Sequence, residues 1–339
     1  MAKLTVEIKQ HTPIIHSHYG HPNEILRATE LKSKMKFYLK KNGIEDVQLK
    51  IRTSCPDRVN SYIPNRKLFL GNMGRNGGNP IKYHFSEDIL KLEINTNIPG
   101  IEDKLKQSVT ETLCLENFGS CSSKGFGCFI PEGINRYEFE KILKDNVPVK
   151  PVLRYYVDQT EQIYPTIADI YTKIKRGNHS ANPRFTSIVR DYFLTKDITW
   201  EKRMIKETFF RGSRSFDTIK NTQRYCRGVL GTSTEQEWRH QSKIIEVHGG
   251  EFERVPSSLI FKVFYDKTDQ RQYIYFWFNN YHGEFDNLYG AQFNFNIKND
   301  PPAGTLSLKI PSNTEFIPSD FMNYIKSRLT YLESNDDWK

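Results

Sequence analysis

The segment Asn117–Cys128 carries the residues best suited to bind an anion, because NFGSCSSKGFGC holds three glycines, three serines and one lysine. Glycine lets the backbone approach closely, while hydroxyl and ammonium groups offer donors to phosphate oxygens. A mononucleotide P-loop needs its lysine directly after a glycine, whereas Lys124 precedes Gly125. The pattern favours a loop lying flat against an RNA backbone, with a ligand-free connecting loop as the alternative. The predicted RNA contacts are Gly119, Ser120, Ser122, Ser123, Lys124, Gly125, Phe126 and Gly127.

Four histidines crowd the N-terminal segment HTPIIHSHYGH, namely His11, His16, His18 and His21. A histidine can be the general base that activates a ribose 2′-hydroxyl for attack on its own phosphate. The same side chains can also stack on RNA or simply cover a polar loop. We predict no catalytic role for them. We also predict no metal site here, because carboxylates are missing nearby.

The five cysteines form no C-x2-C pair, and an odd number without an export signal argues against a disulfide framework. Cys114, Cys121 and Cys128 are seven residues apart, a longer spacing than zinc sites use. We expect structural thiols. The sequence therefore predicts neither a bound metal nor another cofactor.

Positive charge points to a polyanionic partner. The chain has 339 residues and a formal net charge of +9. The helical segment Glu24–Lys41 concentrates cations, of which Arg27, Lys32 and Lys36 are predicted to contact RNA; a solvated helix face is the alternative. A later loop, FFRGSRSFDTIKNTQRYCRG, interleaves basic and aromatic residues as single-strand binders do. Its predicted contacts are Arg211, Arg214 and Arg224, unless it is an ordinary surface loop.

Hydrophobic periodicity places the glycine-rich loop on a β-α-β-β-α-β framework. The expected elements are a strand over 4–8, a helix over 24–41, strands over 47–51 (or 66–70) and 89–95, a helix over 101–117 and a strand over 126–130. Gly119 stands where a glycine could cap the second helix. This order is the ferredoxin-like, RRM-like arrangement, in which the loop joins the second helix to the last strand.

A change in composition at DNVPVKPVLRYY divides the chain into residues 1–146 and 147–339. In the second part, the sequence patterns predict helices over 163–175, in pieces within 185–210 and behind Pro318. They predict strands over 152–158, 258–265, 272–278, 290–297 and 305–310. The aromatic run YIYFWF could stack on bases, but an aromatic strand is more typical of a sheet core or of a subunit contact. The predicted class is α+β.

Three motifs resemble those of the repeat-associated mysterious proteins (RAMPs) of CRISPR systems. They are the strand VEIKQHTPII, the helix EILRATELKSKMKFYLKK and the loop NFGSCSSKGFGCF. The resemblance is greatest to the first-subunit family of the type III-B, Cmr-type effector, and GVLGTS with ERVPSSLIFKVF is similar to its second half. Ser33 replaces a glycine of the helix motif, Lys32 and Lys36 replace arginines, and Cys121 replaces a basic residue.

The resemblance implies two ferredoxin-like RAMP modules with helical and loop insertions. It also implies a non-catalytic, RNA-binding subunit that contacts guide RNA (crRNA) near its 3′ end, helps to capture complementary target RNA and assembles with other effector subunits. A metal-independent repeat endoribonuclease using the N-terminal histidines is the alternative, and a generic single-strand binder is a third. We expect a cytoplasmic protein without membrane contact, since no run of 18 apolar residues exists.

Overall fold

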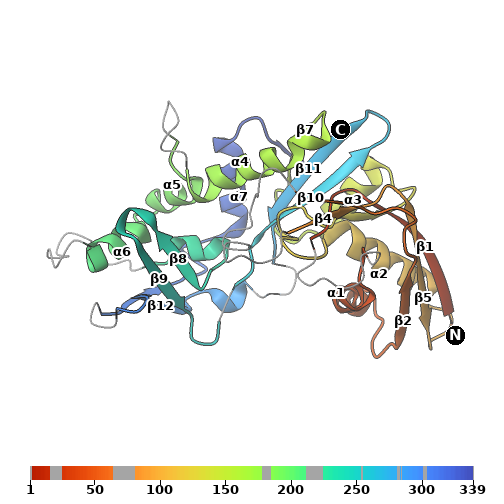
Figure 1. The fold of residues 1–339 in the computed structure, drawn as a ribbon, viewed down its shortest axis with the longest axis horizontal. Helices are drawn as coiled ribbons and strands as arrows, with labels where there is room; N and C mark the ends of the chain where they lie inside the picture. Colours follow the sequence, from red (N-terminus) through yellow and green to blue (C-terminus); the bar gives the residue numbers. More distant parts are fainter. Residues whose placement is uncertain are drawn as a thin grey trace.

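The first half of the chain forms an antiparallel sheet in the order β2-β5-β1-β6 (Figure 1). The computed structural model describes residues 2–15, 25–63, 81–177, 185–210, 224–252, 255–280, 283, 285–300 and 304–338. The elements are β1 (Ala2–Gln10), α1 (Ala28–Lys41), β2 (Leu49–Thr53), β5 (Ile89–Thr96), α2 (Glu102–Leu115) and β6 (Phe129–Pro131). A hairpin of β3 (Asn60–Tyr62) and β4 (Tyr83–Phe85) is inserted between β2 and β5.

Alternation along the strands decides which face of this first sheet is buried. Ile8 and Leu92 point to a core that Leu31 and Met35 of α1 and Val109 of α2 complete. The side chains of the opposite face are at least partly exposed. They are Lys3, Thr5, Glu7, Lys9, Lys50, Arg52, Ile89, Lys91, Glu93 and Asn95. This face, called the open sheet face below, presents charged residues and no aromatic side chain on these three strands.

The second half repeats the same strand order around its own sheet, β10-β11-β7-β14. Its elements are β7 (Leu153–Val157), α4 (Ile163–Lys175), β10 (Leu259–Asp266), β11 (Arg271–Phe278), α7 (Pro318–Arg328) and β14 (Glu333–Ser334). In each sheet the first and third strands lie in the centre, and the second and fourth lie at the edges. The pairs in both sheets are antiparallel.

Both faces of the central strand β11 are buried. Tyr275 and Trp277 pack against Phe139 of α3 (Arg136–Asn146) on one side. Phe276 packs against α4 and α7 on the other, where Ile167 lies in the same core. The aromatic run is therefore a sheet core. The alternative of a subunit contact on this strand is wrong for the described chain.

Helix α3 is an element that hydrophobic periodicity does not predict. Its signal is a capping box: the Asn135 side chain accepts a hydrogen bond from the Glu138 backbone at 2.9 Å, and the Glu138 carboxylate accepts one from the Asn135 backbone at 3.1 Å. An Asn followed three residues later by Glu is a sequence-level start signal. The helix begins directly after it.

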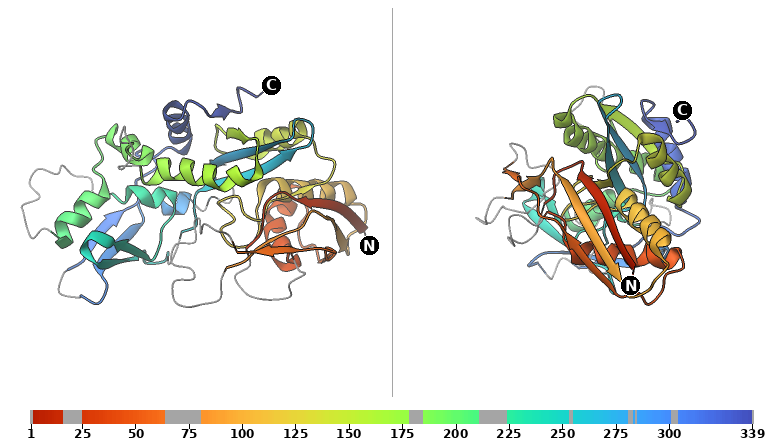
Figure 2. Two further views of the ribbon diagram at one scale, coloured as in Figure 1. Left: turned by 45° about the horizontal axis from the view of Figure 1, so that its top comes forward. Right: turned by 90° about the vertical axis from the view of Figure 1, so that its right-hand side faces the viewer.

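Two insertions interrupt the second half. The first adds α5 (Ile188–Leu194), α6 (Glu201–Phe210), β8 (Glu235–Trp238) and β9 (Lys243–His248), and the second adds β12 (Gln292–Ile297) and β13 (Leu306–Lys309). The four strands make a third sheet, β13-β12-β9-β8. Figures 1 and 2 show this sheet at the end of the molecule away from β1 and β2. Strands β8, β9 and β14 are not predicted by the sequence patterns.

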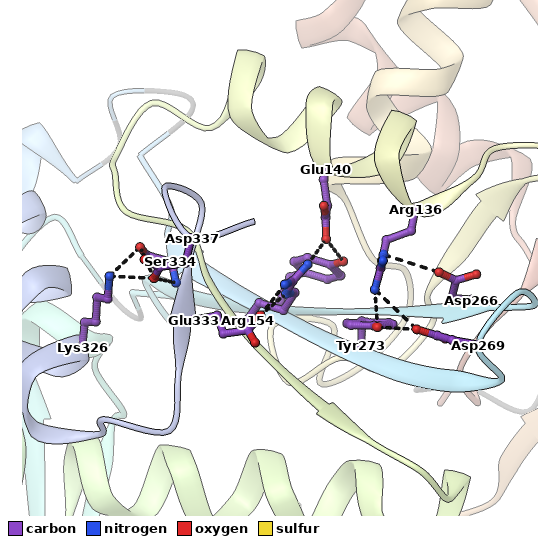
Figure 3. A network of polar contacts seen from close by, with 11 residues as sticks. Arg136, Glu140, Arg154, Asp266, Asp269, Tyr273, Lys326, Glu333, Ser334 and Asp337 are labelled. Atoms are coloured by element: carbon purple, nitrogen blue, oxygen red, sulfur yellow. Dashed lines mark hydrogen bonds and ion pairs between the residues drawn. The ribbon is translucent and has the colours of Figure 1, made fainter. Parts of the chain in front are cut away.

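A row of ion pairs fastens the C-terminal segment to the second sheet (Figure 3). The Arg154 guanidinium on β7 lies between the carboxylates of Glu140 on α3 and Glu333 on β14. Beyond β14, the Lys326 ammonium contacts the Asp337 carboxylate at 2.8 Å. Arg154 is buried, so its two partners supply the compensation that a buried charge needs.

The α+β class is confirmed, with four antiparallel sheets in the described chain. Two expected details are wrong. Helix α2 ends at Leu115 and continues into an extended Glu116, so Gly119 is not its capping glycine. The strand after the loop begins at Phe129 instead of Phe126. The alternative strand over 66–70 lies outside the described residues. None of the described helices has the length and apolar character needed to cross a bilayer.

Candidate nucleic-acid interface

Helix α1 carries a row of lysines, but two of them are neutralised inside the protein. The Lys34 ammonium lies 3.5 Å from the Glu116 carboxylate and donates to the Asn117 carbonyl. The Lys41 ammonium lies 3.3 Å from the Glu111 carboxylate. These acidic partners belong to α2 and the residues just after it, so they are invisible in the sequence of α1 alone. Lys34 and Lys41 therefore hold the two helices together.

The three predicted contacts on α1 differ in how they present their charge. The half-buried Arg27 is the residue before the first turn of α1. The Lys32 ammonium donates to the Leu49 carbonyl at 3.1 Å, which ties α1 to β2. Lys36 is exposed and makes no ion pair with a carboxylate of the described chain. Of the three, Lys36 is the one whose charge is open to a ligand.

The first part of the glycine-rich loop, Gly119–Ser123, lies against α1 and the N-terminal segment. The Gly119 N–H donates to the Glu30 carboxylate at 2.9 Å, and the Ser120 N–H donates to the Ile15 carbonyl at 2.7 Å. These residues are half-buried. The structure thus brings the loop and α1, two separately predicted contact regions, next to each other.

The second part of the loop, Lys124–Cys128, is buried. The Gly127 N–H donates to the Pro13 carbonyl at 2.8 Å. The Phe126 ring stacks on Tyr164 of α4 with a centroid distance of 4.1 Å. A Cβ on Gly125 would meet the Ile167 Cδ1 atom at 3.1 Å. The expectation of one flat anion-binding surface is therefore wrong for this part, whose backbone contacts protein instead.

Lys124 is the charged group at the centre of this buried part and is only 7% exposed. Its ammonium lies 3.5 Å from the centroid of the Tyr171 ring and 2.9 Å from the Ser257 hydroxyl. Desolvation, and then the neighbouring Lys175, lower the pKa of Lys124 to about 8. A short parallel bridge from Lys124 to Phe261 ties the loop to β10. The loop joins the two halves of the chain.

A buried lysine that the sequence analysis overlooked supports the same junction. Lys262 of β10 is fully buried, and its ammonium donates to the carbonyls of Leu113 at 2.6 Å and Glu116 at 2.5 Å. These carbonyls belong to the C-terminal end of α2, where a cation is favoured. Desolvation lowers the pKa of Lys262. Its only sequence signal is a single lysine inside the apolar strand SLIFKVFY.

The predicted contacts in the later basic loop are mostly beyond the described chain. Arg211 and Arg214 lie outside the described residues. Arg224 is described, and its guanidinium Nε lies 2.9 and 2.8 Å from the two carboxylate oxygens of Glu315. The charge of Arg224 is already compensated within the protein.

Of the four N-terminal histidines, only His11 falls within the described residues. Its Nδ1 atom accepts a hydrogen bond from the Tyr265 N–H at 2.8 Å, and its ring lies 5.5 Å from the Phe264 ring. Desolvation, followed by the charge of Lys262, lowers the pKa of His11 to about 3. A base with this pKa is weak near neutral pH. His11 therefore joins β10 to the segment after β1.

Two of the three evenly spaced cysteines lie in the core. Cys114 and Cys128 are buried, and desolvation raises the pKa of the Cys114 thiol to about 12. The Cys128 thiol donates to the Val263 carbonyl at 2.9 Å. Within the described chain, no three His, Cys, Asp or Glu residues converge as metal ligands would.

Family models match both halves of the chain. One described as the Cmr1 N-terminal domain matches residues 1–55 and 40–178, and one described as the Cmr1 C-terminal domain matches residues 184–336. No curated protein matches significantly.

Two solved structures are similar over most of their length. Cmr1 from Pyrococcus furiosus, in its apo form, shares 11% identity with a TM-score of 0.43, covering 99% of each chain. A chain of the type III-B Cmr-β complex, bound to cognate target RNA and AMPPnP in the presence of ssDNA, shares 12% identity with a TM-score of 0.41. That match covers 96% of this chain and 98% of the other.

Proposed function

This chain belongs to the Cmr1 family, and from that premise we propose that it is a non-catalytic, RNA-binding subunit of a type III-B CRISPR effector complex. In this role it contacts guide RNA near the 3′ end and helps to capture complementary target RNA beside other subunits. The observation that carries the proposal is the match of both family models, which together span nearly the whole chain. The net charge of +9 supports a polyanionic partner.

We further propose that the two sheets are ferredoxin-like modules. Each has two central strands, the first and third of its half, and two helices in the connections that a β-α-β-β-α-β unit uses. The open sheet face lacks the aromatic platform on which RRM proteins stack bases. We therefore assign RNA contacts to two parts of the first module, the exposed Lys36 of α1 and the half-buried Gly119–Ser123 that lies against α1. Such contacts bind the RNA backbone and leave sequence recognition to base pairing.

The nuclease alternative receives no specific support from the described residues. His11 is held by the Tyr265 N–H at one ring nitrogen and has a strongly lowered pKa. His16, His18 and His21 lie outside the described residues. We keep the non-catalytic assignment as part of the proposal.

A matched pair of substitutions on α1 tests the proposal. Both Lys36→Gln and Lys34→Gln remove one positive charge, but Lys34 is already bound to Glu116 whereas Lys36 is exposed. Lys36→Gln should flatten the slope of log affinity against log salt by about 0.7, the value of one single-strand phosphate contact. Lys34→Gln should leave the slope unchanged.

The measurement is fluorescence anisotropy of labelled single-stranded RNA with the full chain at several KCl concentrations. For unrelated RNA sequences the isolated chain should bind weakly, in a range of about 10⁻⁴ to 10⁻⁶ M. If the wild-type chain binds no RNA under any of these conditions, the RNA-binding function is wrong. Equal salt slopes for the wild type and Lys36→Gln would show that Lys36 does not contact an RNA phosphate.

A further inference from the structure

The second sheet has an edge that β14 covers only in part. Strand β14 pairs Glu333 with Arg154 and Ser334 with Leu153 of β7, and it ends there (Figure 3). Further along β7, residues 155–157 pair with β11 on one side. On the other side they pair with no strand of the described chain. The last part of β7 is therefore an open strand edge.

The backbone of Tyr156 points toward this open edge. In an antiparallel ladder, alternate residues direct both their N–H and their C=O to the same side. Val152 directs both groups toward the β14 segment: its C=O accepts from the Asn335 N–H at 3.0 Å, and its N–H donates to the Asn335 side-chain oxygen at 2.9 Å. An even number of residues separates Tyr156 from Val152, so Tyr156 shares this direction. No group of the described chain bonds to its N–H or C=O there. Such groups are a template for another strand.

A cavity of about 550 Å³ lies along the same edge. It is lined by residues 154–158 together with Tyr331 and Glu333, which belong to the segment around the start of β14. Tyr156 and Tyr331 are 38% and 42% exposed, and the Tyr331 ring meets the Tyr155 ring edge-on at a centroid distance of 5.4 Å. The cavity thus lies where a longer β14 would continue beside β7, and tyrosine rings flank it.

The charge that this edge presents to solvent is negative, although the whole chain is positive. Glu333 and Asp158 stand at the two ends of the open edge. The Glu333 side chain is 44% exposed and its partner Arg154 only 9%, while Asp158 is 74% exposed and its partner Arg271 42%. In both ion pairs the carboxylate is the more accessible group. The edge therefore attracts a cation better than a phosphate.

We propose that an extended segment of a partner protein pairs with β7 at Tyr156 and so adds a strand to the second sheet. The N–H and C=O of Tyr156 decide the class of partner, because a polypeptide backbone supplies both an acceptor and a donor at strand spacing. This interaction surface goes beyond the proposed function and does not depend on RNA binding.

The side chains of the partner segment follow from alternation along a strand. One set faces the side of Glu333 and Asp158, where lysine or arginine fits the accessible carboxylates. The other set faces the side of Tyr155 and Tyr331, where an apolar side chain fits the exposed rings. The expected segment therefore alternates basic and apolar residues. RNA is a poor occupant, because its phosphates would meet the carboxylates.

The test uses the fluorescein-labelled peptide Thr-Lys-Val-Lys-Val-Lys-Thr and a control peptide in which glutamate replaces each lysine. Fluorescence anisotropy with the full chain should show saturable binding of the lysine peptide and weaker binding of the glutamate peptide. Tyr156→Pro and Tyr156→Val both remove the ring, but only proline removes the N–H. Tyr156→Pro should bind the lysine peptide about tenfold more weakly than Tyr156→Val, because a peptide carbonyl is left unpaired. An edge strand tolerates proline where its N–H faces away from the sheet, and circular dichroism checks the fold.

A charge reversal gives a second test that does not depend on how proline is accommodated. Asp158→Lys changes an exposed side chain, so the fold should persist. It should weaken binding of the lysine peptide by about two- to fivefold and strengthen binding of the glutamate peptide by a similar factor, the scale of an exposed ion pair. If Tyr156→Pro does not fold, unchanged binding of both peptides to Asp158→Lys would overturn the proposal.

The remaining outcomes are equally decisive. No saturable binding of the lysine peptide by the wild type up to about 1 mM, or equal binding by Tyr156→Pro and Tyr156→Val, would overturn the docking edge. An RNA affinity that falls in Tyr156→Pro but not in Tyr156→Val would also overturn it, by making RNA the occupant. A wild-type chain that binds the lysine peptide but no RNA would support the docking edge and contradict the proposed function.

Discussion

The two four-stranded sheets share one strand order but differ in what covers them. In the first sheet, α1 and α2 bury one face and the other is exposed and charged. In the second, α3 covers one face of β11 and α4 with α7 covers the other. The same topology therefore occurs in two environments. The second sheet lies in a core between helices, whereas the first sheet leaves one charged face in solvent.

Some positive charges are exposed and others are paired, whatever the charge density of the segment that carries them. Lys36 on α1 and Lys91 on the open sheet face are exposed. In the second module, Arg154 and Arg224 are each held by carboxylates. A basic residue is thus a good candidate for RNA contact only when the fold leaves its charge without an internal partner.

The largest expected effect tests the difference in burial. Phe276 of β11 is fully buried and stacks on Phe261 at a centroid distance of 5.0 Å. Phe276→Ala should lower the free energy of unfolding by about 3 to 5 kcal/mol, because it creates a cavity in the core. Lys91→Ala on the open sheet face should change it by less than about 0.5 kcal/mol. Urea unfolding followed by circular dichroism measures both.

Similar losses for the two variants would contradict this division between the sheets. A small loss for Phe276→Ala would mean that β11 repacks easily. A large loss for Lys91→Ala would mean that the open sheet face contributes to the folded core.

The order of strands and helices could be predicted wherever one periodic pattern dominates. The alternation in β1 and β5 and the helical stripe of α2 identify the first module. By contrast, β8 has four mostly polar residues and β14 has two, so both carry too little pattern to be recognised; β9 is not predicted although it is as long as the predicted β12. The pairing of β14 with β7 depends on Arg154 and Glu333, which lie far apart in sequence.

The candidate site could be predicted only in part, because residue type does not reveal internal partners. The sequence selected Lys36 and the Gly119–Ser123 part of the loop, which the fold leaves exposed and half-buried, respectively; their contact with RNA stays a prediction. It also selected Lys124 and Phe126, which α4 and β10 bury from a distance of more than 30 residues along the chain. Lys262 could not be predicted, because a single lysine within an apolar strand belongs to no recognisable motif. Tertiary contact decided each of these cases.

A smaller effect distinguishes two glycines in the left-handed region. Gly127 has φ of 66°, and a Cβ there would lie 1.9 Å from the Phe118 carbonyl oxygen. Gly133 has φ of 88°, and a Cβ there would meet no atom within 4 Å beyond its chain neighbours. Gly133→Ala should cost about 1 to 2 kcal/mol from backbone conformation alone. Gly127→Ala should cost about 2 to 4 kcal/mol, because overpacking is added.

Thermal and urea unfolding of the two alanine variants measure this difference. Equal losses would show that the loop moves away from Phe118 at little cost. The buried part of the loop, Lys124–Cys128, would then rearrange more easily than its burial suggests.

The last effect concerns the contact between the modules at His11 and grows with each unit of acidification. Its ring accepts the Tyr265 N–H, and its pKa is lowered to about 3 from a reference of about 6.5. Between these values the unfolded chain binds more protons than the folded chain, so stability falls as pH decreases. One such group contributes at most about 1.4 kcal/mol per pH unit. The contact should therefore be fully stabilising above about pH 6.5 and weaken steadily on acidification.

The variant His11→Asn isolates this contribution, because an asparagine oxygen can accept the same hydrogen bond without binding a proton in this range. Urea unfolding between pH 7 and pH 4 should give a shallower pH dependence for His11→Asn than for the wild type. Identical slopes would show that acid weakens the protein elsewhere. A shallower pH dependence in His11→Asn would show that part of the acid sensitivity arises where His11 of the first half contacts Tyr265 on β10 of the second half.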